Sequence, residues 1–108
     1  MDAMTRARFD ARARILKALA HPTRLFFLDQ LGHGERCVCE LAAMVDADVS
    51  TISKHLALLK NAGLVRDDKR GNKVFYSLTA PEALDFLSTV EAVLKTTAEA
   101  QAELVGES

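Results

Sequence analysis

The fold is indicated most clearly by the stretch VCELAAMVDADVSTISKHLALLKN, residues 38–61. Apolar residues recur at helical spacing on both sides of the Asp-Ala-Asp segment at 46–48, so we expect two short helices joined by a tight turn. The first helix is predicted over about 38–45 and the second over about 49–61. Asp48 suits the N-cap of the second helix, because its carboxylate can accept the free N–H groups there. This pattern is typical of a helix-turn-helix.

The same spacing predicts which side chains of the two helices face the core. These are Leu41, Met44 and Val45 in the first helix, and Ile52, Leu56 and Leu59 in the second. The opposite face of the second helix is polar. A helix that reads DNA needs short polar side chains for base edges and cations for phosphate. Candidate DNA contacts on this helix are therefore Ser50, Thr51, Ser53, Lys54 and His55.

Beyond Gly63 the apolar period changes from 3.6 to 2, which predicts two short strands at 64–67 and 73–78. Gly71 and Asn72 are turn residues, so the strands form a hairpin with a basic tip. Its candidate DNA contacts are Lys69, Arg70, Asn72 and Lys73. A helix-turn-helix (38–61) followed by such a hairpin, or wing (64–78), predicts a winged helix-turn-helix that is mainly α-helical.

Three further helices are predicted at 5–19, 22–31 and 82–103. The helices at 5–19 and 82–103 have no place in a minimal DNA-binding unit, and their spare apolar stripes suit a dimer interface. The Lys and Arg side chains of 5–19 either contact DNA or form a solvated face.

Length and charge fit a single small DNA-binding domain spanning residues 1–108. The net charge is −1. Residues 1–79 hold 13 of the 14 Lys and Arg against 9 acids, giving +4, and residues 80–108 hold 1 against 6, giving −5. The basic part can face phosphate while the acidic part stays away from it. No apolar run approaches membrane-spanning length and the first residues lack a signal-peptide pattern, so we expect a cytoplasmic protein without membrane contact.

Cys37 and Cys39 are the only cysteines and stand at the start of the helix-turn-helix. Thiolates so close together can bind a soft metal or metalloid, or form a redox-active site. In a regular helix the two side chains point about 200° apart, so joint binding requires an extended first turn. A disulfide between them would close almost no loop, so we expect free thiols in a reducing compartment. The alternative is two small, half-buried apolar residues.

Several motifs together resemble the ArsR/SmtB family of bacterial metal-sensing repressors. They are AHPTRL at 20–25, CVCEL at 37–41, STISKHLALLKNAGLV at 50–65 and GNKVFYSL at 71–78. The resemblance implies a homodimeric winged-helix repressor that binds an inverted repeat of double-stranded DNA in its own promoter. It also implies that the repressor leaves this operator when an effector binds, and that no other cofactor is required.

The resemblance further implies As(III) or Sb(III) as the inducer, because Cys-Val-Cys at this position marks the arsenic-sensing branch. This sequence departs from that branch at Ala42, where a third thiol is usual. A third thiol must therefore come from another molecule or from a second subunit. Within the chain, His33 is the candidate third ligand. The resemblance also implies that Cd(II) and Pb(II) fit less well, because the cadmium and lead branch of the family adds cysteines in its N-terminal arm and residues 1–20 have none. It disfavours Zn(II), because the zinc branch uses histidine and carboxylates of the last helix and residues 80–108 lack histidine.

Three alternatives to the metal-responsive repressor stay open. The same cysteines suit a repressor that responds to thiol oxidation or persulfide. A winged-helix regulator without a metal effector is also compatible with the sequence, and so is a module that uses its helix-turn-helix for protein contact. An enzyme is not expected, because the chain has no Ser-His-Asp set, no paired-carboxylate pattern and no phosphate-binding loop.

Overall fold

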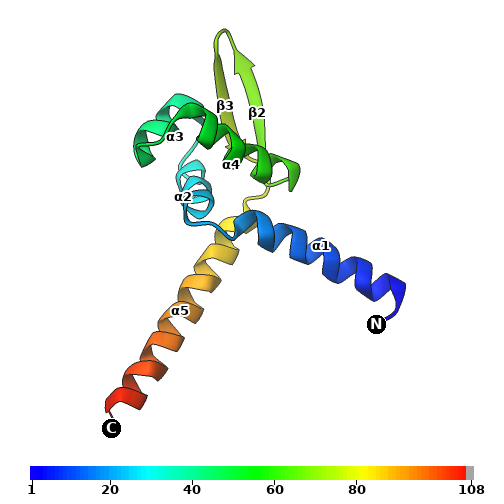
Figure 1. Cartoon of the computed structure of the whole chain (residues 1–108), viewed down its shortest axis with the longest axis vertical. Helices are drawn as coiled ribbons and strands as arrows, with labels where there is room; N and C mark the ends of the chain where they lie inside the picture. The colour runs from blue at the N-terminus through cyan, green and yellow to red at the C-terminus, as the bar shows by residue number, and fades with distance from the viewer. Residues whose placement is uncertain (107–108) are drawn as a thin grey trace.

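The computed structural model describes residues 1–106, with side chains described as far as Ala102. Eight elements follow one another along the chain (Figure 1). They are α1 (Ala3–Leu19), α2 (Pro22–Leu31), β1 (Arg36–Cys37), α3 (Val38–Val45), α4 (Val49–Asn61), β2 (Val65–Arg70), β3 (Lys73–Leu78) and α5 (Glu82–Gly106). All five predicted helices and both predicted strands are present.

The two helices α3 and α4 form the predicted helix-turn-helix. Asp46 ends α3 in the left-handed conformation, with φ 50°, which a short polar side chain tolerates better than a branched one. Asp48 is the N-cap of α4, as predicted, and its Oδ1 accepts a hydrogen bond of 2.7 Å from the Thr51 N–H. The turn therefore reverses the chain within three residues and fixes where α4 begins.

The sheet has three antiparallel strands in the order β1-β3-β2. In the wing, Arg70 pairs with Lys73, so only Gly71 and Asn72 form the loop. Gly71 has φ 62°, the conformation that a two-residue hairpin loop requires, and it lets β2 extend three residues beyond the predicted 64–67. The sequence did not predict β1, which lies beside β3 with Arg36 opposite Tyr76.

The core lies between α2, α3, α4 and the base of the wing. Ile52, Leu56 and Leu59 are fully buried, as predicted, and so is Leu41. The prediction for Met44 is wrong, because its side chain is 41% exposed. The inward face of α3 is instead the helical set Val38, Leu41, Ala42 and Val45, which packs in the core.

Helices α1 and α5 extend away from this core in different directions, and the wing projects on the far side (Figure 1). Their apolar stripes lie open, with Phe9 53%, Leu16 50% and Leu94 60% exposed. Where the two helices diverge, a cavity of about 450 Å³ has an almost wholly apolar lining that includes Leu16, Leu19 and Phe86. None of the helices in residues 1–106 has the length and apolar character needed to cross a membrane.

Candidate functional site

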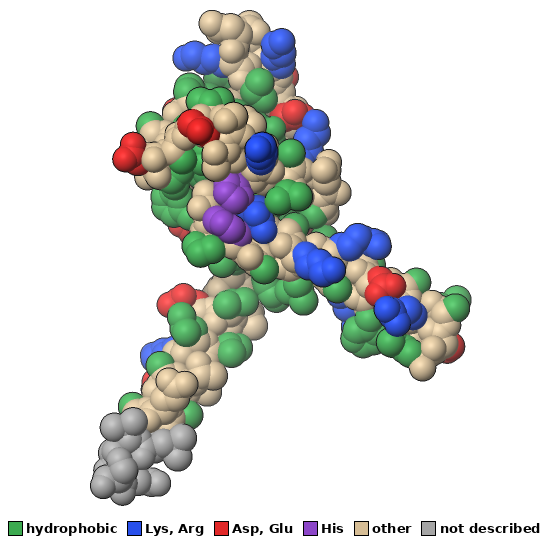
Figure 2. Space-filling view, viewed as in Figure 1, with side chains coloured by type: hydrophobic (Ala, Val, Ile, Leu, Met, Phe, Trp, Pro, Cys, Tyr) green, Lys and Arg blue, Asp and Glu red, His purple; other side chains and the backbone are tan. Residues whose placement is uncertain are grey.

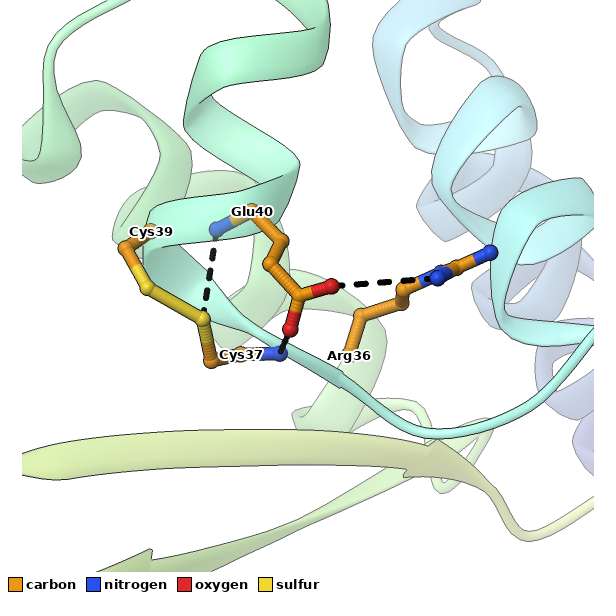
Figure 3. The surroundings of a disulfide bond; sticks show 4 residues. All are labelled: Arg36, Cys37, Cys39 and Glu40. Atoms are coloured by element: carbon orange, nitrogen blue, oxygen red, sulfur yellow. Dashed lines mark hydrogen bonds and ion pairs between the residues drawn. A yellow bond between two sulfur atoms is a disulfide. The ribbon is translucent and has the colours of Figure 1, made fainter.

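Cys37 and Cys39 lie together where β1 runs into α3, and with Glu40 they form what we call the cysteine corner (Figure 3). Cys37 is the N-cap of α3, with extended backbone (φ −80°, ψ 158°), and Cys39 is the second residue of the helix. The extended backbone that joint binding would require is thus present at Cys37, and the two Cα atoms lie 5.4 Å apart. This separation lies within the range that a disulfide needs.

The structure joins Cys37 and Cys39 in a disulfide, so the prediction of two free thiols is wrong for this state. The argument from loop closure still holds for stability, because a ring closed over two residues constrains little of the unfolded chain. The small gain in stability does not prevent the disulfide from forming. In a regular helix the two side chains would point apart, but the extended conformation of Cys37 brings them together. Cys37 is buried, whereas Cys39 is exposed to solvent.

The cysteine corner also contains a capping box, which sequence reasoning missed. Cys37 Sγ accepts a hydrogen bond of 3.3 Å from the Glu40 N–H, and Glu40 Oε1 accepts one of 3.1 Å from the Cys37 N–H. The other carboxylate oxygen of Glu40 lies 3.7 Å from Arg36 Nη1 (Figure 3). A cysteine three residues before Glu40 was the signal, because sulfur here replaces the usual Ser or Thr hydroxyl. The state of Cys37 therefore bears directly on the first turn of α3.

A cavity of about 300 Å³ adjoins the cysteine corner, between α3, α4 and the wing. It is lined by Cys37, Val38, Cys39, Val49, Ser53, Asn72, Lys73 and Val74. The fold thus brings both cysteines beside three of the residues predicted to contact DNA. A group bound to the sulfur atoms would share this space with the recognition helix and the wing.

No third metal ligand accompanies the cysteines in the described part of the chain. Among the side chains of residues 1–102, no group of three or more His, Cys, Asp or Glu is placed to hold a metal ion. Ala42, which stands where a third thiol was expected, is buried in the core. His33 lines a different cavity, beside Leu84 and Glu91 of α5. The site therefore offers two sulfur donors, and only after reduction of the disulfide.

The predicted DNA contacts of α4 fall into two groups. Thr51, Ser53 and Lys54 are exposed and available. Ser50 is exposed too, but its hydroxyl donates a hydrogen bond of 3.1 Å to Asp48 Oδ1. Hydrogen bonds from Thr51 and then Ser50 lower the pKa of Asp48, so this carboxylate stays charged at the N-terminus of α4.

His55 is part-buried, and the Nδ1 side of its ring is held by α2. Its Nδ1 lies 3.0 Å from Nη1 of Arg24, and its ring centroid is 4.3 Å from that of His21. Burial, followed by the charges of His21 and Arg24, lowers the pKa of His55. We call His21, Arg24 and His55 the histidine corner. Sequence reasoning missed Arg24, because its partner is 31 residues away.

The wing presents Lys69, Asn72 and Lys73 as exposed side chains at its tip. Arg70 differs, because its Nε donates a hydrogen bond of 2.9 Å to Asp68 Oδ2 and its Nη2 pairs with Glu35. The guanidinium also lies 4.4 Å from the centre of the Phe75 ring. Two carboxylates thus offset the charge of Arg70, which leaves Lys69 and Lys73 as the unpaired cations among the predicted wing contacts.

Comparison with known proteins identifies the family. Residues 21–67 match the model described as "Bacterial regulatory protein, arsR family". The chain is 34% identical over 87 residues to the HTH-type transcriptional regulator Rv0081 of Mycobacterium tuberculosis, a match covering 80% of this chain and 76% of that protein. The chain belongs to the arsR family of bacterial regulatory proteins.

Two arsR-family relatives carry names that refer to metals or metalloids. The chain is 42% identical over 67 residues to a cadmium resistance transcriptional regulatory protein CadC homolog of Staphylococcus aureus. That match covers 61% of this chain and only 55% of that protein. It is 43% identical over 67 residues to the arsenical resistance operon repressor of Escherichia coli, covering 61% and 57% respectively. These relatives are transcriptional regulators, which agrees with the expectation that the chain is not an enzyme.

Solved structures confirm the winged helix-turn-helix fold. The crystal structure of M. tuberculosis Rv0081 superposes with a TM-score of 0.79 at 29% identity, covering 94% of this chain and 99% of that one. The homodimeric winged helix-turn-helix DNA-binding domain of Mycobacterium bovis Mb0332 gives 0.78 at 31% identity, covering 92% of each chain.

Proposed function

We propose that this arsR-family regulator is a homodimeric repressor that binds an inverted-repeat operator and leaves it when a thiophilic ion binds Cys37 and Cys39. As(III) and Sb(III) are the ions we favour. The observation that carries this proposal is the cavity beside the cysteine corner, because it joins the two sulfur atoms to Ser53 of α4 and to Asn72 and Lys73 of the wing.

Binding to DNA is supported by the exposed polar face of α4 and by the cations of the wing. Short hydroxyl side chains at the start of α4 can reach base edges, as Thr51 and Ser53 do in this proposal, while Lys54 reaches a base or a phosphate. Lys69 and Lys73 at the wing tip contact the phosphate backbone. The acidic α5 points away from this surface (Figure 1).

A homodimer is supported by the exposed apolar stripes of α1 and α5 and by the apolar cavity between them. A second copy that covers these stripes would remove several large apolar side chains from water, at roughly 25 cal/mol per Å² of buried area. The winged helix-turn-helix domain of the M. bovis relative is homodimeric, which also supports a dimer. Sedimentation of the intact chain at micromolar concentration should give a dimer, and a monomer there would contradict the proposal.

The ion-binding step requires reduction of the disulfide to two thiolates. Once bound, As(III) or Sb(III) supplies a strong link between two soft sulfur donors, which suits ions of this class. Cys37 Sγ caps α3 and Cys39 projects from its first turn, so a bridge between them acts on the helix that supports α4. In this proposal the third donor comes from outside the subunit, either from a solvent or thiol molecule or from the other subunit.

The test is titration of the reduced protein on operator DNA with As(III), Sb(III), Cd(II), Pb(II) and Zn(II). We expect As(III) and Sb(III) to release DNA most effectively and Zn(II) least. Cys37→Ser and Cys39→Ser should each bind DNA and lose the response. Operator DNA should weaken ion binding by the same factor by which the ion weakens DNA binding. If both variants still release DNA at the wild-type ion concentration, the cysteines are structural.

The disulfide favours a second candidate function, a repressor that responds to oxidation. In this reading the two thiols form the Cys37–Cys39 bond and release two protons, while a disulfide or persulfide oxidant accepts the two electrons. Exposure of Cys39 makes it the thiol that an oxidant reaches first. Operator binding should then differ between fully reduced and fully oxidised protein without any metal, and a chelator should not restore it. Equal affinity in the two states would exclude this candidate.

A further inference from the structure

We propose that the histidine corner is a binding site for a backbone phosphate of DNA, next to the recognition helix. This inference rests on the proposed DNA-binding function. It adds two residues outside α4, His21 and Arg24, and assigns a phosphate contact to His55. Figure 2 shows histidine side chains side by side on one face of the molecule, next to a Lys or Arg side chain.

Arg24 is fixed at the junction of three helices. Its Nε donates a hydrogen bond of 2.6 Å to the Ala18 carbonyl, and its Nη2 lies 3.4 Å from the Lys17 carbonyl, both in the last turn of α1. Its Nη1 donates to Nδ1 of His55 on α4, because a guanidinium has no acceptor. These three bonds hold the guanidinium in one place and leave one N–H on each terminal nitrogen unused.

The two imidazoles complete a surface that only donates hydrogen bonds. His55 Nδ1 accepts from Arg24, so its ring proton lies on Nε2. His21 Nδ1 accepts a hydrogen bond of 3.0 Å from the Thr23 N–H, so its ring proton also lies on Nε2. The acceptor atoms of both rings are therefore occupied by protein, and the donors remain.

No carboxylate offsets the charge of this cluster in the described part of the chain. The ion pairs of residues 1–102 involve Arg6, Arg36, Lys60 and Arg70, but not Arg24. The groups whose charges act on His55 are His21 and Arg24, both of them basic. His21 is also the N-cap of α2, whose N-terminal dipole favours an anion. A permanent cation, two N–H donors and a helix N-terminus together suit a phosphate group.

The position of the cluster makes DNA the source of that phosphate. His55 lies on α4, the helix that reads DNA in our proposal, and all three residues of the cluster are part-exposed, so we place the backbone of the bound duplex beside the cluster. Such a contact is independent of base sequence. It can therefore be tested on a duplex of mixed sequence, without knowledge of the operator.

The first test compares Arg24→Gln, Arg24→Lys and Lys95→Gln in salt titrations of binding to this duplex. Arg24→Gln should flatten the dependence of log affinity on log salt by about one unit for each protomer on DNA. Arg24→Lys keeps the charge and should keep the slope. Lys95→Gln removes an equal charge from exposed α5 and should leave the slope unchanged. If the slope of Arg24→Gln equals that of Lys95→Gln, Arg24 only joins helices and the inference is wrong.

The second test separates the two nitrogen atoms of His55. His55→Asn places an oxygen near the position of Nδ1 and keeps the acceptor for Arg24, but it removes the Nε2 donor. His55→Gln places its amide near Nε2 and keeps the donor. We expect His55→Asn to lose about tenfold in affinity with unchanged thermal stability, and His55→Gln to bind more tightly than His55→Asn. Wild-type affinity in His55→Asn would overturn the inference, whereas absence of wild-type DNA binding at every salt concentration would overturn the proposed function itself.

Discussion

The recognition helix α4 has two flanks that are built from different chemistry. On one side the cysteine corner holds the first turn of α3 through Cys37 and Glu40, and a cavity separates it from Ser53. On the other side the histidine corner bonds directly to α4 through Arg24 and His55. The cysteine corner depends on sulfur atoms, whose bonding metals and oxidants can change. The histidine corner depends on the Arg24 guanidinium, which keeps its charge at all relevant pH values.

This difference indicates how one small domain can both hold DNA and release it. The histidine corner supplies a constant attraction to phosphate in our proposal, and the cysteine corner supplies the part that an effector alters. Both flanks act on the same helix, whose inward residues form the centre of the core. Each prediction below perturbs one flank, or the core behind both, and compares the result with a matched variant.

The largest effect should follow from Leu56→Ala, which truncates a fully buried side chain in the core behind both flanks. Leu56 is fully buried, and truncation of such a leucine costs about 2–5 kcal/mol in lost burial and cavity formation. Leu58 lies two residues away on α4 but is 49% exposed, so Leu58→Ala should change the free energy of unfolding by less than about 1 kcal/mol. Urea unfolding of the two variants measures this, and equal losses would place Leu56 outside the core.

A smaller effect is expected at the cysteine corner, from Cys37→Ala in reducing buffer. This change removes the acceptor for the Glu40 N–H and should lower the free energy of unfolding by about 1 kcal/mol. Cys37→Ser keeps a capping oxygen and should lose less. Cys39 accepts no capping hydrogen bond, so Cys39→Ala serves as the control. Chemical denaturation of the three reduced variants distinguishes them, and the capping role is refuted if Cys37→Ala is as stable as Cys37→Ser.

Much of the fold could be predicted from the sequence, because helix and strand periods are local properties. The bounds of α2 and α4 and of β3 agree with the prediction, and Asp48 caps α4 as expected. For Cys37 and Cys39 the sequence indicated only that joint binding requires extended backbone, which the structure has at Cys37. Met44 was misplaced although the bounds of α3 also agree with the prediction, because helical spacing does not fix which side of α3 packs against α4 and β3.

The parts that the sequence did not predict depend on contacts between distant segments. β1 has only two residues, too few to show a period, and it exists because Arg36 and Cys37 pair with β3. The bond between Arg24 and His55 joins α2 to α4 across the core, so no local spacing reveals it. The disulfide depends on the redox state as well as on geometry, which a spacing of two residues does not specify.

A further prediction concerns the turn that separates the two flanks. Asp46 has φ 50°, where a β-branched side chain is strained and glycine is not. Asp46→Val should therefore be less stable than Asp46→Gly by about 1 kcal/mol, as thermal melts of the two variants would show. Asp48→Asn, which keeps a capping side chain at the end of the same turn, controls for the loss of a negative charge. Equal melting temperatures for the valine and glycine variants would contradict the strained geometry.

The smallest effect should be the pH dependence of stability that His55 contributes, because its ring is only part-buried. Burial, followed by the charges of His21 and Arg24, lowers the pKa of His55 in the folded protein. In the unfolded chain that pKa returns to about 6.5, so between the two values the unfolded state binds more protons than the folded state. The stability that comes from neutral His55 is therefore fully present above about pH 6.5 and is lost as the pH falls through the folded pKa.

His55→Asn keeps the acceptor for Arg24 and cannot titrate. Urea unfolding at about pH 7.5 and about pH 5.5 should show a larger loss of stability for the wild type than for His55→Asn. Equal losses would mean that the bond to Arg24 does not depend on the protonation of His55, and the histidine corner would then be as insensitive to pH as its guanidinium.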